Sequence, residues 1–166
     1  MPAEPWLCGP IEGISPILMP AAHALLQAQQ DIEQYASDLT PDQLWYEPNG
    51  VPSVGYHLRH IDGSSDRLLT YAKGEALSVA QFAFLKAEGS PESPLPTASE
   101  LVVVAQKRIA ALIEFLRLTP DENLFSERFV GRAKLSTNVI GLLFHIAEHT
   151  QRHVGSLIVV SKIVRS

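Results

Sequence analysis

The stretch Ser136–Val160, STNVIGLLFHIAEHTQRHVGSLIVV, has the clearest periodicity in this chain. Its apolar residues recur three or four positions apart, which places them on one face of an α-helix. This face carries Val139, Leu142, Ile146 and Leu157. The stretch also begins with a serine, which is a favourable N-cap. The pattern predicts a long amphipathic helix that packs one face against a protein core.

Three further stretches have the same helical spacing of apolar residues. They are residues 17–36, residues 53–73 with Ser53 as N-cap, and residues 98–118. A capping box formed by Thr97 and Glu100 marks the start of the last of them. Four long amphipathic helices joined by loops predict an all-α protein with a four-helix bundle.

The segments between these helices are rich in proline, glycine and polar residues. We expect an irregular lead-in over residues 1–14, short helical segments over residues 40–45 and 78–86, and irregular chain over residues 89–96 and 121–135. No segment shows the clean alternation of polar and apolar residues that is typical of a strand. The 166 residues are interpreted as a single helical domain, residues 1–166.

The composition argues against several classes of function. There are 13 Lys and Arg residues against 18 Asp and Glu residues, which gives a net charge of −5 and disfavours nucleic acid as a partner. Cys8 is the only cysteine, so the chain cannot form an internal disulfide or a cysteine-based zinc site. The sequence has no apolar run of the roughly 20 residues that span a membrane, and no signal peptide at its start. We therefore expect a cytoplasmic protein without a membrane partner.

Five of the six histidines occur in two clusters. His145, His149 and His153 follow one another at intervals of four residues in the last predicted helix, and His57 and His60 are three residues apart in the second. Residues at these spacings lie on the same side of a helix, so a pair of imidazoles can reach one metal ion. Two helices of a bundle that each offer inward imidazoles can together form a three-histidine metal site.

A helical wheel separates the candidates within each cluster. His149 and His153 lie on or beside the apolar stripe of the last helix, and His145 lies further out. In the second helix, the wheel places His57 nearer the core and His60 on the flank. Helical periodicity therefore selects His149 and His153, and favours His57 over His60 by a small margin.

Several motifs resemble the DinB-like, or YfiT-like, family of metal-dependent enzymes. They are Ser53–Ile61 (SVGYHLRHI) with Asp66–Leu69 (DRLL), and His149–Leu157 (HTQRHVGSL). The segments Leu39–Pro48 and Glu75–Gly89 are also similar to the family. The resemblance implies His60, His149 and His153 as the metal ligands. We follow it over the wheel in the second helix and keep His57 as the runner-up.

The resemblance also implies an up-down-down-up helix order, a divalent ion (zinc or nickel) in an open cleft, and a homodimer. Characterised family members include thiol-dependent transferases and isomerases. One departure concerns Gly155-Ser156, where the family often has Gly-Gln after the last histidine. If that glutamine orients a ligand, Ser156 is too short to replace it.

Three neutral imidazoles leave a divalent ion with at least one open position. Water bound there would support hydrolysis, and a low-molecular-weight thiol would support S-transfer to a small-molecule substrate. The alternative is a non-catalytic bundle that binds metal for structural reasons or acts through a partner interface. A site with four protein ligands, including His57 or His145, would favour that alternative.

Other polar and aromatic residues are expected to have structural roles. Glu148, Asp62 and Asp66 fall on polar helix faces and are interpreted as surface charges or helix-surface pairs. Trp45 is interpreted as a core residue in preference to a wall of the cleft. His23 is also interpreted as structural.

Overall fold

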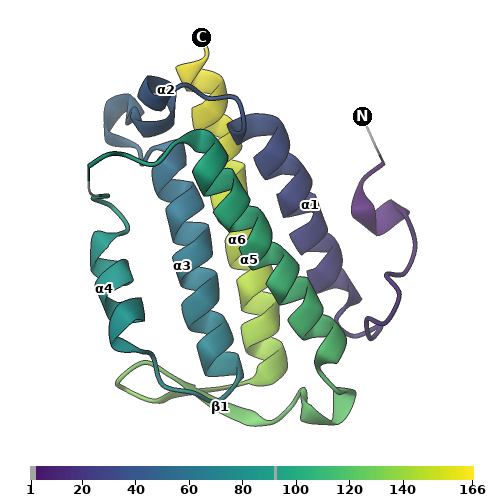
Figure 1. The fold of residues 1–166 in the computed structure, drawn as a ribbon. Coiled ribbons are helices and arrows are strands. Elements are labelled where there is room, and N and C mark those ends of the chain that lie inside the picture. Colours follow the sequence, from purple (N-terminus) through teal and green to yellow (C-terminus); the bar gives the residue numbers. More distant parts are fainter. Residues whose placement is uncertain (1–2, 92) are drawn as a thin grey trace.

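Four long helices form the body of the protein (Figure 1). The computed structural model describes residues 3–91 and 93–166. The long helices are α1 (Met19–Ala36), α3 (Val54–Ala72), α5 (Ala98–Leu118) and α6 (Val139–Val164). In Figure 1, α1 and α6 run in one direction while α3 and α5 run in the opposite direction. The predicted all-α four-helix bundle, with its up-down-down-up order, is confirmed.

Two short helices lie in the connections of the bundle. The first, α2 (Pro41–Trp45), begins at a capping box in which the Thr40 hydroxyl accepts from the backbone N–H of Gln43. The second, α4 (Val79–Ala87), begins at an equivalent capping box formed by Ser78 and Gln81. Single 3-10 turns occur at Pro5–Leu7, Pro48–Gly50 and Asp121–Asn123.

The expectation of irregular chain before the last helix is wrong. Strands β1 (Glu127–Val130) and β2 (Leu135–Asn138) pair antiparallel as a small hairpin. The strands are short and none of their residues is fully buried, so burial imposes little alternation on their sequence. Because β2 continues to Asn138, α6 begins at Val139, and the Asn138 side chain, in place of Ser136, caps the helix by accepting from the Gly141 N–H at 2.8 Å.

Aliphatic side chains from all four long helices form one core. Leu25, Ile61, Ile109 and Ile146, one from each helix, are at most 1% exposed. Their burial provides the main driving force for folding, since each fully buried side chain of this size contributes about 1.5–3 kcal/mol. Among the described residues, no helix combines the length and hydropathy needed to cross a membrane.

Polar contacts fix the helices around this core. Arg108 of α5 forms ion pairs with Asp62 and Asp66 of α3, at 2.7 and 2.8 Å. The two aspartates therefore connect two helices, which is more than the surface role expected from the sequence. Gln29 of α1 and Gln106 of α5 each donate a side-chain hydrogen bond to the other's backbone carbonyl.

Helix α4 lies against α3 at a glycine. A Cβ atom added to Gly63 would lie 2.5 Å from Cε1 of Phe84, and it would also clash with the Glu88 carboxylate. Arg59 of α3 holds the end of α4 by donating to the carbonyls of Ala87 and Glu88, at 2.8 and 3.0 Å. These contacts place Glu88 directly beside α3.

We predict that Gly63→Ala destabilises the protein by about 1–3 kcal/mol, because the new methyl group must displace Phe84 and Glu88. Gly155→Ala is the matched control, since it also lies inside a helix but a Cβ there meets nothing within 4 Å. It should be neutral or stabilise the protein through helix propensity. Urea unfolding of both variants measures the difference, and equal midpoints would contradict the close packing at Gly63.

Candidate metal centre

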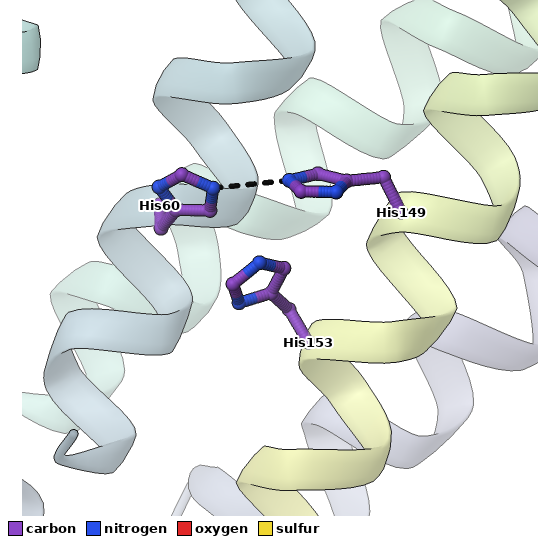
Figure 2. A group of neighbouring side chains, drawn as sticks. All are labelled: His60, His149 and His153. Carbon is purple, nitrogen blue, oxygen red and sulfur yellow. Dashed lines mark hydrogen bonds between the residues drawn. The ribbon is translucent and has the colours of Figure 1, made fainter. Parts of the chain in front are cut away.

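Helices α3 and α6 bring three histidines together. His60 lies on α3, His149 and His153 lie on α6, and one ring nitrogen from each lies within 4.8 Å of the others. Figure 2 shows the three imidazoles projecting from the two helices toward one another. Nε2 of His60 and Nε2 of His149 are 3.0 Å apart. These are the three residues that the family resemblance implied.

The other two clustered histidines lie outside this group. His57 is only 5% exposed, as the wheel predicted, and its Nδ1 lies 3.0 Å from Nδ1 of His153. It is therefore a neighbour of the cluster. His145 is exposed and its Nδ1 lies 2.6 Å from the Glu148 carboxylate, which also accepts from Arg152. This trio forms a surface network, in agreement with the wheel and with the surface role expected for Glu148.

The environment keeps the inward imidazoles neutral. Burial, followed by the charge of His60, lowers the pKa of His149 to about 4 and that of His153 to about 3. The same two causes lower the pKa of His57 to about 4. A metal ion requires the unprotonated ring nitrogen. The site is therefore ready to accept a cation at neutral pH without first releasing protons from these rings.

Glu88 contacts the cluster from the end of α4, and it could not be identified from the sequence. Its Oε2 lies 2.9 Å from Nδ1 of His60, and its Oε1 accepts from Arg67. Burial acts to raise the pKa of Glu88, but the hydrogen bonds from His60 and Arg67 outweigh it and lower the pKa. Glu88 follows a short helix in a segment of mixed composition, 28 residues after His60, and no periodicity connects the two.

Aromatic residues near the cluster have two different roles. Tyr56 stacks on His60 with ring centroids 5.7 Å apart and planes inclined by 16°. Trp45 packs its ring over Gly55, where an added Cβ would lie 2.7 Å from Cζ3, and its Nε1 donates to the Pro96 carbonyl. Tyr56 is thus the aromatic contact of the site, and Trp45 holds the start of α3, as the core interpretation predicted.

Two residues outside the cluster make purely structural contacts. The Ser156 hydroxyl donates to the Arg152 carbonyl of its own helix, so Ser156 does not orient a histidine of the cluster. His23 contacts the Gly9 carbonyl at 3.0 Å and ties the lead-in to α1, which agrees with its expected structural role.

The donor set fits a divalent transition metal. Imidazole nitrogens are good ligands for zinc, copper, iron and nickel. Two nitrogens bound to one tetrahedral zinc ion lie about 3.3 Å apart, which is close to the observed 3.0 Å between His60 and His149. Among the described residues, His149 Nδ1 and His57 Nε2 are buried without a hydrogen-bond partner. Such polar atoms are costly in a closed core and are typical of functional sites.

We predict that the metal-free protein loses stability as the pH falls from 7 to 5. The pKa of His57 is lower in the folded than in the unfolded chain, so the unfolded chain binds more protons between about pH 6.5 and pH 4. The contribution of neutral His57 to the free energy of unfolding is therefore complete above this window. It decreases on acidification, by on the order of 2 kcal/mol at pH 5 for His57 alone. Urea unfolding at both pH values, with chelator present, measures the loss.

His57→Gln should reduce this pH dependence by the His57 share, because glutamine does not titrate, and the rest should remain because the pKa values of His149 and His153 are also lowered. His145→Gln removes an exposed histidine and should leave the pH dependence unchanged. A wild-type midpoint that is the same at pH 7 and pH 5 would contradict the neutral, buried state of His57.

Comparisons with known proteins agree with this architecture. Over 93% of the chain and 92% of its counterpart, the structure superimposes on YfiT from Bacillus subtilis with a TM-score of 0.65 and 16% sequence identity. YfiT is described as a probable metal-dependent hydrolase with an unusual four-helix bundle topology. No curated protein sequence matches the chain. The family model of the DinB superfamily matches residues 24–157, and the chain belongs to that superfamily.

Proposed function

We propose that the protein is a metal-dependent enzyme whose divalent ion is held by His60, His149 and His153. The observation that carries this proposal is the convergence of three ring nitrogens within 4.8 Å of one another, from two helices that are far apart in sequence. Three clustered imidazoles would be unfavourable if they served packing alone, because ring nitrogens that are removed from water need hydrogen-bond or metal partners. Metal binding gives these nitrogens a common partner.

Three protein ligands are typical of catalytic zinc sites, whereas structural sites usually have four. When bound, the ion would supply a Lewis acid that makes water or a thiol nucleophilic at neutral pH. We propose zinc or nickel, since imidazole is a favourable ligand for both. The side chain of His60 is 17% exposed, and all three histidines are only partly buried, so the cluster is in contact with solvent.

The reaction that we propose is hydrolysis or S-transfer on a small-molecule substrate. The description of YfiT as a probable metal-dependent hydrolase supports hydrolysis. A low-molecular-weight thiol as co-substrate would instead give S-transfer. Assays of the zinc-loaded and nickel-loaded protein on ester, amide and electrophilic substrates, each with and without added thiol, separate the two reactions. Turnover that requires the thiol would assign S-transfer, and turnover without it would assign hydrolysis.

We predict that the purified protein binds one zinc or nickel ion per chain. His60→Ala, His149→Ala and His153→Ala should each weaken binding by more than about 100-fold, since even outer partners of a ligand are worth about 10–100-fold. His145→Ala is the matched control, because it removes an exposed histidine of the same helix and should retain the ion. Stoichiometric metal in all three single variants would contradict the ligand assignment.

A second candidate function is a closed structural metal site. The observation that favours it is His57, whose Nε2 is buried without a described partner and whose Nδ1 lies 3.0 Å from His153. If His57 moved to become the fourth ligand, the ion would have no open position for a substrate.

The cobalt-substituted protein distinguishes the two functions. In an open site, added cyanide or cysteine should change the visible absorption of the cobalt, and His57→Gln should still bind one ion. A spectrum that does not respond to either ligand, together with loss of metal in His57→Gln, would establish the closed site.

A further inference from the structure

We propose that Glu88 is a positioning residue that fixes His60 in the tautomer needed for metal binding. Its carboxylate would keep the proton of His60 on Nδ1, which leaves the Nε2 lone pair directed into the cluster. The metal-binding consequence rests on the proposed function. The tautomer itself is a property of the metal-free protein and can be measured separately.

In the contact between His60 and Glu88, only the imidazole of His60 can be the hydrogen-bond donor. An ionised carboxylate is only an acceptor, so the 2.9 Å contact requires His60 Nδ1 to carry the hydrogen. In a neutral imidazole the other nitrogen then has no hydrogen and acts as an acceptor. That nitrogen, Nε2, lies 3.0 Å from His149 Nε2 and so belongs to the cluster. Outer carboxylate partners of this kind orient metal-binding histidines in many proteins.

The surrounding residues hold the Glu88 carboxylate in one position. Its side chain is only 5% exposed, and Arg67 pairs with the oxygen that does not contact His60. Arg59 donates to the carbonyls of Ala87 and Glu88, which belong to the two peptide groups on either side of the Glu88 Cα. Gly63 provides the space for the carboxylate on α3. Residues of α3 thus hold both the backbone and the side chain of Glu88, and its carboxylate cannot turn away from His60 without breaking the pair with Arg67.

A second trio in the same protein shows why burial matters. Glu148 also bridges a histidine and an arginine, His145 and Arg152, but their side chains are 46% and 62% exposed. Water competes for these hydrogen bonds, and His145 does not belong to the cluster. Glu88 and Glu148 are therefore comparable, since each carboxylate lies between a histidine and an arginine, although His145 and Arg152 share Oε1 of Glu148. The proposal predicts that only Glu88 affects the metal site.

Glu88→Gln tests the proposal with little change in shape. Arg67 is only a donor, so it should attract the amide oxygen and leave the amide NH₂ facing His60 Nδ1. His60 would then accept at Nδ1 and carry its hydrogen on Nε2, where it blocks metal binding. Glu148→Gln is the control. Zinc affinity, measured by competition with a chelator, should fall about 10–100-fold in Glu88→Gln and stay within about 2-fold in Glu148→Gln.

The tautomer is measured by ¹⁵N NMR of the His60 side chain in the metal-free protein. We expect the hydrogen on Nδ1 in the wild type and on Nε2 in Glu88→Gln. A wild-type His60 with its hydrogen on Nε2 would overturn the proposal. So would a Glu88→Gln variant that melts at a lower temperature but keeps the wild-type tautomer and zinc affinity, because that result describes a purely structural residue.

If the proposed metal-dependent function is wrong, the experiments give a different result from a failure of the Glu88 proposal. If the wild-type protein binds no zinc or nickel, the metal assignment is wrong, but the NMR measurement still decides whether Glu88 sets the His60 tautomer. Should Glu88→Gln fail to fold, the wild-type tautomer alone supports or overturns the proposal.

Discussion

The site depends on the packing of α6 against α3. These helices run antiparallel, so successive turns of one face successive turns of the other in reverse order (Figure 1). His60 therefore contacts His149, and His57, one turn earlier, contacts His153. The aliphatic core fixes this register, because a shift of one residue would rotate Ile61 and Ile146, both at most 1% exposed, toward solvent. The geometry of the cluster is thus a consequence of the same packing that stabilises the fold.

Electrostatics gives the cluster its chemical character. Burial disfavours the charged form of an imidazole, and the neighbouring histidines add to this effect for His149 and His153. The compensating charges lie outside the cluster, where the Glu88 carboxylate is balanced by Arg67. The result is a group of nitrogen donors in which His149 and His153 are neutral and the Glu88 carboxylate lies behind His60. This arrangement suits a divalent cation, because the lowered pKa values of His149 and His153 leave these rings unprotonated and His60 is held by a charged partner.

Helix positions and part of the site could be predicted from the sequence for a physical reason. Helical periodicity is a local property, so it identified the four long helices and the inward direction of His149 and His153. Burial alone could not choose between His57 and His60. The wheel selects the residue nearest the core, and His57 is indeed the more buried of the two. The nitrogen that α3 adds to the cluster comes instead from His60, on the flank of α3 that faces His149. The role of Glu88 depends on a contact with His60 across 28 residues, which leaves no periodic pattern in the sequence. The hairpin also leaves no such pattern, because its strands are short and not fully buried.

The most direct test of the account is an anomalous-scattering crystal structure of the protein loaded with zinc or nickel. We predict one strong peak per chain between α3 and α6, in contact with one ring nitrogen each of His60, His149 and His153. A map without a peak at this position, or a peak held by other residues while the three rings stay apart, would contradict it.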